Sequence, residues 1–364
     1  MEKTILFGCV LMVALHVSVA VNPNVVAITG KRQDVIQLND AETLETVQVI
    51  EDKSGNKLFQ LISLGRNIYV TTVNNDEELH AELRMYEIQS RTNKLEFVQS
   101  KSYGIQCIQP IALTASYDYS DQTVLAMTCL ETDTVMVVNP ATLKLIKVIP
   151  KPVIKDILIK DIAESAMTAR YLYVAYVIGP QFDDDFSQGL LVQYSRNTWE
   201  VVNFSIVRGQ YFHLLIAGSS DLFLTATGNG ESYLLQLNPN TLEEVNRKTP
   251  KGFDFLRMTM TPDQRSFYMY IHGSAKKAGR MRSFDQTIYP ANKFCSDVRI
   301  EMSPGTQPIV INGYLFIRSN KSMTRFTLKS ESGCPRQKSQ AAYTLDSVQD
   351  SGVAMACLNC LSIS

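Results

Sequence analysis

Thr134-Val-Met-Val-Val-Asn139-Pro-Ala-Thr142-Leu143-Lys-Leu-Ile-Lys-Val148 is the stretch that decides the fold. It consists of an apolar run, a polar turn built on Asn-Pro, and a second run with alternating apolar residues. Alternation with a period of two is typical of β-strands, and Asn-Pro favours a turn. The stretch therefore predicts a β-hairpin.

The same pattern recurs along the whole chain. Equivalent positions in the expected third strands lie 42 to 56 residues apart along the chain: Ile36, Met85, Val137, Gln193, Leu235, Ser283 and Phe326. A repeat of this length, with almost no helical periodicity, is typical of four-stranded propeller blades. We therefore expect an all-β fold, a seven-bladed β-propeller of four-stranded blades, with residues 21–364 forming a single domain.

The first blade lacks one strand in this assignment. An open ring would leave unpaired strand edges between the first and last blades, and such edges are a liability. The C-terminal stretch 350–357, which ends Gly352-Val-Ala-Met-Ala-Cys357, has the composition of a strand. We expect it to add the inner strand of blade one and so close the ring.

Three turns are similar to one another: Asn39-Asp-Ala-Glu-Thr43-Leu44, Asn139-Pro-Ala-Thr142-Leu143 and Asn238-Pro-Asn-Thr241-Leu242. The pattern resembles the YVTN-type repeat of the seven-bladed propeller superfamily that includes quinoprotein-like and lactonase-like proteins. The resemblance implies a fold and no particular activity, because one fold serves many functions. The repeated Asn and Thr side chains bond nearby backbone groups in turns, so their repetition predicts a structural role.

The N-terminus has the features of an export signal. Lys3 precedes a short apolar run, Thr4–Ala20, which ends in the small-residue site Ser18-Val-Ala20. This predicts a signal peptide, residues 1–20, cut after Ala20. The alternative, an N-terminal anchor helix, is disfavoured because the run is shorter than the ~20 residues that a span needs. We expect a secreted, extracellular protein with no membrane span.

Charge and composition exclude some partners. The chain carries 35 basic and 36 acidic residues, and they are interspersed without a basic stripe. Nucleic-acid binding requires such a basic footprint, so no nucleic-acid partner is expected. Hydrophobic residues make up 45% of the chain, which is ordinary for a globular core.

Six of the seven cysteines follow the expected signal peptide, and an even number in an exported chain predicts disulfides: Cys107, Cys129, Cys295, Cys334, Cys357 and Cys360. The blade assignment puts Cys107 and Cys129 on one face, where they can pair, and Cys295 and Cys334 on the opposite face. Cys357-Leu-Asn-Cys360 could be a redox pair, but it lacks a βαβ context and is interpreted as structural. Asn203-Phe-Ser205 and Asn320-Lys-Ser322 are candidate N-glycosylation sites.

Three long loops between second and third strands are expected on one face of the ring, the face of the blade-to-blade links. They contain the binding-face candidates His80, Asp183, Asp184, Asp185, Lys276 and Lys277. Long loops on a rigid scaffold often carry function, although each loop alone could be a solvated insertion. We therefore expect this face to meet a partner.

No cofactor is expected, and Ca²⁺ is kept as an alternative. The carboxylates Asp183 and Asp185 could bind this cation weakly, but the spacing of an EF-hand is absent. A solvated acidic loop is the simpler interpretation. No histidine lies in a zinc-binding pattern, and no nucleophile elbow or Walker loop is present.

Three functions remain open. The first is a non-catalytic binding or matrix protein whose partner is an extracellular protein, glycan or matrix component. The second is a lactonase-like or quinoprotein-like enzyme with a metal in the central channel, to which Asp161, Glu164, Asp254 and His213 could contribute. The third is a small-ligand carrier that uses the channel mouth. The sequence leaves the oligomeric state open.

Overall fold

The computed structural model describes residues 25–30, 35–41, 43–51, 56–73, 80–89, 91–116, 123–179, 188–208, 211–217, 221–228, 231–248, 253–260, 266–273, 280–285, 293–299, 309–311, 314–319, 322–328, 335–336, 343–344 and 353–357. These residues form strands and turns and include no helix. The chain is therefore all-β in its described part, as the period-two patterning predicts.

The strands are β1 (Val25–Gly30), β2 (Val35–Asp40), β3 (Thr46–Glu51), β4 (Lys57–Leu64), β5 (Asn67–Val73), β6 (His80–Ile88), β7 (Leu95–Ile108), β8 (Pro110–Ala115), β9 (Leu125–Cys129), β10 (Thr134–Val138), β11 (Leu145–Pro150), β12 (Ile159–Met167), β13 (Tyr171–Ile178), β14 (Gln188–Ser195), β15 (Val201–Arg208), β16 (Tyr211–Ala217), β17 (Asp221–Gly228), β18 (Glu231–Leu237), β19 (Glu244–Lys248), β20 (Phe253–Met260), β21 (Ser266–Gly273), β22 (Arg280–Asp285), β23 (Lys293–Arg299), β24 (Ile309–Ile311), β25 (Tyr314–Ser319), β26 (Ser322–Leu328), β27 (Pro335–Arg336), β28 (Tyr343–Thr344) and β29 (Val353–Cys357).

Within the described residues these strands form seven antiparallel sheets, here numbered along the chain. Sheet 1 has the order β29-β1-β2-β3, and sheets 2 to 6 take four consecutive strands each, from β4–β7 to β20–β23. Sheet 7 has the order β24-β25-β26, with β27 and β28 both paired to β26. The first strand of each sheet contacts the first strand of the next: β4 contacts β8, and the series continues through β12, β16, β20 and β24.

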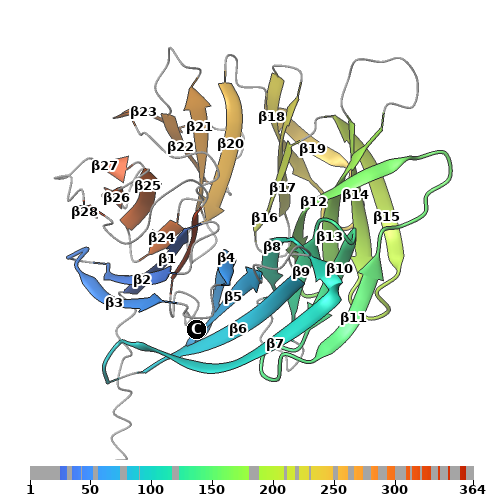
Figure 1. The fold of residues 1–364 in the computed structure, drawn as a ribbon. Coiled ribbons are helices and arrows are strands. Elements are labelled where there is room, and N and C mark those ends of the chain that lie inside the picture. The colour runs from blue at the N-terminus through green and yellow to red at the C-terminus, as the bar shows by residue number, and fades with distance from the viewer. Residues whose placement is uncertain are drawn as a thin grey trace, which may run out of the picture.

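The two ends of the described chain meet in sheet 1. Strand β29 pairs with β1 in a register that puts Val26 opposite Cys357 and Gly30 opposite Val353. Strand β29 also contacts both β4 and β24. Figure 1 shows the sheets following one another around the molecule, so that the orange strands of sheet 7 lie beside the blue strands of sheet 1.

The hydrophobic core lies between neighbouring sheets. In β10, Val135 and Val137 pack with sheet 4, whereas Met136 and Val138 pack with sheet 2. Alternate side chains of a strand point to opposite faces, so a strand that is covered on both sides reads as one continuous apolar run. This explains why Thr134–Val138 contains four consecutive apolar residues.

The third and fourth strands of five sheets are joined by the same turn. In each turn the fifth residue has a positive φ and its N–H donates to the carbonyl of the first: Leu44, Asn93, Leu143, Trp199 and Leu242. The threonine before it accepts an N–H two residues later, as Thr142 Oγ1 does from Lys144 at 3.4 Å. Local side-chain bonds of this kind stabilise turns, so the repeated Thr has a structural role.

The structure corrects the sequence interpretation of these turns in two ways. The residue equivalent to Asn139 is Asp40 and not Asn39, because Asp40 Oδ1 accepts the N–H of Thr43 at 2.8 Å as Asn139 Oδ1 accepts that of Thr142 at 3.0 Å. Asn39 is instead buried in β2. The sequence also predicts a fourth strand over Leu143–Ile149, but the observed strand β11 begins at Leu145, because Leu143 has a left-handed backbone (φ 52°) that ends the turn.

Side chains of one sheet hold the turn of the next. Tyr69 and Tyr103 of sheet 2 donate to the carbonyls of Pro140 and Leu143 at 3.2 and 2.9 Å. Tyr173 of sheet 4 donates to the carbonyl of Pro239 in the turn of sheet 5 at 2.6 Å. We call these contacts turn latches. They fix neighbouring sheets relative to one another, in addition to the apolar packing between them.

Candidate functional site

A disulfide marks one face of the molecule. Cys107 at the end of β7 and Cys129 at the end of β9 are joined, with their Cα atoms 5.2 Å apart, and both residues are fully buried. The bond links the outermost strand of sheet 2 to the second strand of sheet 3. We call the face at which β7 and β9 end the disulfide face. In the described part of the chain, the turn between β9 and β10 (residues 130–133) and the connection from β11 to β12 (residues 151–158) lie at this face.

The loops that the sequence assigns to this face lie largely outside the described residues. This applies to Asp183, Asp184 and Asp185 and to Lys276 and Lys277. His80 is described: it begins β6 and is half-buried. Gly179, which precedes the acidic loop, is described too, and a Cβ atom placed on it would lie 3.3 Å from Leu158 Cδ2. Gly179 thus lies against the connection between sheets 3 and 4.

A polar cluster occupies the part of the face that belongs to sheet 2. Glu82 Oε2 accepts hydrogen bonds from Asn56 Nδ2 at 3.1 Å and from Arg84 Nη2 at 3.2 Å. The side chains of Arg84 and Glu82 are only 10% and 20% exposed. A charge pair that is partly buried and hydrogen-bonded is held in one geometry, so this cluster orders the ends of β4 and β6.

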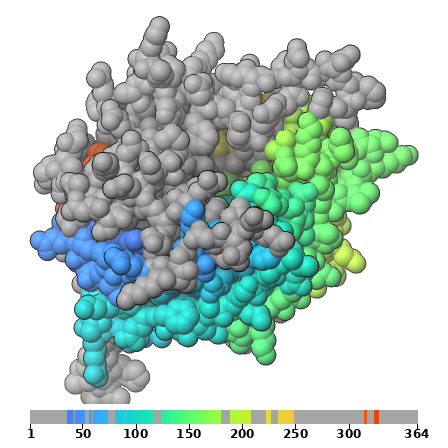
Figure 2. Space-filling view, in the orientation of Figure 1, coloured from blue at the N-terminus to red at the C-terminus, as the bar shows by residue number. Residues whose placement is uncertain are grey.

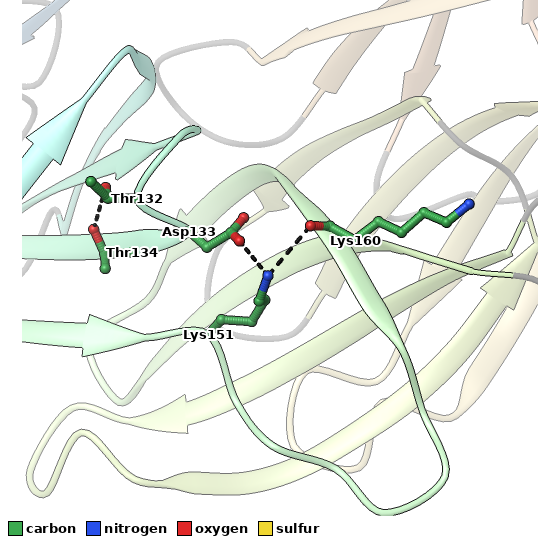
Figure 3. A network of polar contacts seen from close by, with 5 residues as sticks. All are labelled: Thr132, Asp133, Thr134, Lys151 and Lys160. Atoms are coloured by element: carbon green, nitrogen blue, oxygen red, sulfur yellow. Dashed lines mark hydrogen bonds and ion pairs between the residues drawn. The ribbon is translucent and has the colours of Figure 1, made fainter. Parts of the chain in front are cut away.

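A second polar cluster joins sheets 3 and 4 (Figure 3). Lys151, directly after β11, forms an ion pair with Asp133 in the turn between β9 and β10. Its Nζ atom also donates to the carbonyl of Lys160 in β12 at 3.4 Å, while the side chain of Lys160 points away from the contact. One ammonium group therefore ties three separate segments together.

Two buried tyrosines lie close to this ion pair. The hydroxyls of Tyr176 and Tyr194 are 3.1 Å apart. Burial raises the pKa of Tyr176 well above its ordinary value, and the charges of Tyr194 and Asp133 add to the effect. Burial also raises the pKa of Tyr194 to about 12. Both hydroxyls are therefore neutral at physiological pH, which suits a structural hydrogen bond rather than a nucleophile.

Three large apolar side chains are exposed at the disulfide face, one in a strand and two in a connection. Ile105 is 73% exposed near the end of β7. Val153 and Leu158 are 100% and 68% exposed in the connection that follows Lys151. Single exposed apolar residues are common on protein surfaces, whereas larger exposed apolar areas often mark interaction sites. Figure 2 shows the described residues of sheets 1 to 4 as a continuous surface band.

Of the four inner-strand residues expected near a channel, two have side chains in the described part of the structure. Asp161 is exposed and Glu164 is half-buried, both on β12. His213 and Asp254 lie on β16 and β20, and their side chains lie outside the described part. No group of three His, Cys, Asp or Glu residues that could hold a metal occurs among the described residues.

The remaining expected sites are distributed as follows. Cys295 lies in β23 and Cys357 in β29, whereas Cys334, Cys360 and Asn320 lie outside the described residues. Asn203 lies in the middle of β15, where its Nδ2 atom donates to the carbonyl of Thr241 in the turn of sheet 5 at 2.7 Å. Asn203 is thus itself a turn latch.

Sequence reasoning missed the contacts that shape this face. Lys151 and Asp133 are distant in sequence, and nothing in the run Lys151-Pro-Val-Ile identifies the partner of the lysine. The available signal was the set of four aliphatic residues, among them Val153 and Leu158, in the connection 151–158 that continues no strand. In the part of the chain that the structure describes, no helix has the length and hydropathy needed to cross a membrane.

Comparison with known proteins gives matches in structure only. No protein-family model matches the chain, and no curated protein matches it in sequence. The chain is similar to the structure of a presumed 6-phosphogluconolactonase from Bacteroides uniformis, with 12% identity over 91% of this chain and 99% of that chain and a TM-score of 0.59.

Two further structures are similar over most of their length. A functionally unknown protein from Desulfotomaculum acetoxidans shares 13% identity over 92% of this chain and 99% of that chain, with a TM-score of 0.58. Hydrazine synthase from Kuenenia stuttgartiensis shares 14% identity over 78% of this chain and 80% of that chain, with a TM-score of 0.54. At these identities the likeness concerns the fold alone, and the fold is of the β-propeller type.

Proposed function

We propose that this chain is an exported, non-catalytic propeller that binds an extracellular protein through the disulfide face. The observation that carries the proposal is the exposure of Ile105 near the end of β7 and of Val153 and Leu158 in the connection from β11 to β12. Burial of aliphatic side chains against another protein gives favourable free energy, whereas recognition of a glycan requires aromatic and polar groups. A protein or a protein component of a matrix is therefore the favoured partner.

The fixed position of the segments that carry these three side chains supports the proposal. Ile105 lies close to the buried Cys107–Cys129 disulfide, and Val153 follows Lys151, which is tied to Asp133. Anchored side chains lose little conformational entropy when a partner binds, so more of the contact energy becomes affinity. The charged groups around them correspond to the polar rim of an interface.

We also propose that the seven sheets are seven blades and that the ring is closed. Two sets of contacts support closure: β29 contacts β4 and β24, and the Arg325 side chain of sheet 7 reaches sheet 1. Export is supported by the signal-like residues 1–20, and a disulfide is typical of oxidising compartments.

The experiment is a binding assay on protein produced in secretory cells and collected from the medium. The probe is decellularised matrix deposited by the same cells. A variant with Ile105→Asp, Val153→Asp and Leu158→Asp is expected to lose retention on the probe. The control variant Val245→Asp changes a side chain that is 61% exposed on β19 and should be retained like the original protein. Equal retention of the triple variant, or no retention of the original protein, contradicts the proposal.

Metal analysis of the purified protein separates this proposal from the enzyme alternative. A lactonase-like site in the channel requires one tightly bound Ca²⁺ or Zn²⁺ per chain. We expect less than stoichiometric metal after dialysis against a weak chelator. One retained ion per chain would favour an enzyme.

A further inference from the structure

Strand β15 has an unusually apolar outer edge. It is the last strand of sheet 4, and within the described residues it pairs only with β14. Val201, Val202, Phe204 and Ile206 are 43%, 54%, 44% and 48% exposed. An exposed apolar edge strand can pair with the edge of another molecule, and natural proteins usually prevent this.

The other described outer strands carry the usual protection. Charged residues or proline lie within β3 (Glu51), β7 (Lys101), β11 (Lys147 and Pro150) and β19 (Arg247). Such residues disfavour edge-to-edge pairing. Strand β15 has a charge only at its last residue, Arg208, as β3 has only at Glu51. It differs from these outer strands in carrying four exposed large apolar side chains within a run, Val201–Val207, that has neither a charge nor a proline.

The centre of this edge is a sequon. Asn203-Phe-Ser205 satisfies the N-x-Ser/Thr pattern for N-glycosylation, and Asn203 is half-buried in β15. Its Nδ2 atom donates to Thr241, and its Oδ1 atom accepts the N–H of Phe204 at 2.9 Å. N-glycosylation replaces one of the two hydrogens on Nδ2, so one N–H and the carbonyl oxygen remain. Both contacts are therefore chemically compatible with a glycan.

We propose that Asn203 carries an N-linked glycan that covers the edge of β15 and blocks its pairing with a second copy of the chain. This inference rests on the proposed export. The donor is a lipid-linked oligosaccharide diphosphate: the bond between the anomeric carbon and the diphosphate oxygen breaks, and a bond from that carbon to Asn203 Nδ2 forms. Nδ2 loses one proton, and the lipid diphosphate leaves. Transfer to the entering, unfolded chain precedes formation of the Thr241 contact.

A bulky hydrated glycan protects the edge in the way that a lysine does elsewhere. It stands at the middle of the strand, so a second strand cannot run alongside the full length of β15. The remaining turn-latch contact to Thr241 fixes the first sugar near the turn of sheet 5. The apolar side chains then stay exposed to solvent without becoming an interface.

The test uses the full chain secreted from eukaryotic cells, with peptide mapping of residue 203 and size-exclusion chromatography. The variant Ser205→Ala removes the sequon but keeps the Asn203 amide, and Ser205→Thr keeps both. We expect a glycan at Asn203 in the original protein and in Ser205→Thr, each monomeric. In Ser205→Ala, dimers and larger species should become the main fraction. Adding Phe204→Lys to Ser205→Ala should restore the monomer.

Two further arms keep the outcomes distinct. Trimming the folded, glycosylated protein to its first sugar with an endoglycosidase should also promote association, without any mutation. If the chain enters the medium with residues 1–20 removed but Asn203 is unmodified, the inference is wrong while export stands. If the chain is not exported by its own N-terminus, the proposed export is wrong. The glycosylation test is then repeated with a foreign signal peptide in front of the chain. A glycan-free Ser205→Ala protein that stays monomeric overturns the inference.

Discussion

The guanidinium of Arg325 on β26 donates from Nη1 to the carbonyl of Ala41 in the turn of sheet 1 at 3.0 Å. The two residues are 284 positions apart. The same guanidinium lies 4.7 Å from the centroid of the Tyr314 ring. This is a turn latch between the last sheet and the first, so it is the contact by which ring closure can be tested most directly.

Replacing Arg325 by methionine should lower the free energy of unfolding by about 2 kcal/mol, because a hydrogen bond from a charged donor and a cation–π contact are both lost. Denaturant unfolding measures the change. The matched control is Arg91→Met, since Arg91 is exposed. Equal stability of the two variants would show that sheets 1 and 7 do not depend on this contact.

Removing residues 353–364 should prevent folding, because β1 then loses its partner β29 and presents a bare edge beside β4. Soluble yield and near-ultraviolet circular dichroism give the readout. Removing only residues 361–364 leaves β29 and both nearby cysteines intact and should be tolerated. A stable, cooperative fold after the longer truncation would contradict closure by β29.

Replacing both Cys107 and Cys129 by alanine should cost about 3 kcal/mol, since the disulfide closes a loop of moderate length in the unfolded chain. Thermal unfolding of the double variant and the original protein provides the comparison. Because both residues are fully buried, thiol reagents should not label them in the native protein after mild reduction. Rapid labelling under native conditions would indicate that the disulfide face opens.

The buried leucine of the repeated turn should be sensitive to truncation. Leu143 is 1% exposed and has a left-handed backbone, so its burial offsets a conformational cost. Leu143→Ala should destabilise the protein by about 2 to 4 kcal/mol, because the cavity remains and the strain is not relieved. Asn93→Gly at the equivalent position should be nearly neutral, since glycine adopts this conformation readily. Chemical denaturation of both variants tests the pair.

Alkaline pH should destabilise the fold. Burial raises the pKa of both Tyr173 and Tyr194 to about 12, against an unfolded value near 10. The native state holds these protons more tightly, so their contribution is fully present below pH 10 and is lost as the pH rises towards 12. The denaturant concentration at the unfolding midpoint should be clearly lower at pH 11 than at pH 9. The double variant Tyr173→Phe/Tyr194→Phe should show a shallower dependence, and an unchanged slope would contradict this assignment.

Local sequence chemistry predicted much of the fold and little of the site. The Asn139-Pro turn and the alternation around it predicted the β10–β11 pair, and the structural comparisons confirm a propeller-type fold. The equivalent turns at Gln89 and Ser195 were not recognised, because Gln and Ser there do not resemble Asn-Pro although the backbone is the same. The threonine that bonds two residues ahead was the shared signal.

The contacts between sheets could not be predicted from the sequence because they join segments that only the fold brings together. Lys151 meets Asp133 and the carbonyl of Lys160 through three different segments of sheets 3 and 4. Tyr173 meets Pro239 across 66 residues. Neither contact has a sequence spacing or motif from which it could be predicted. By contrast, Cys107 and Cys129 follow from strand direction alone, since both end strands that run to the same face.

The pairing of β29 with β1 has a consequence for synthesis on the ribosome. Sheets 2 to 6 are each made of consecutive strands and can consolidate in the order in which they are translated. Sheet 1 cannot, because its strand β29 is among the last residues to emerge. The longest loop closure is therefore also the final one, and it is the slowest step that topology imposes. Until β29 is made, one edge of β1 has no strand to pair with in sheet 1. Binding of the nascent chain by chaperones should therefore occur mainly during this period.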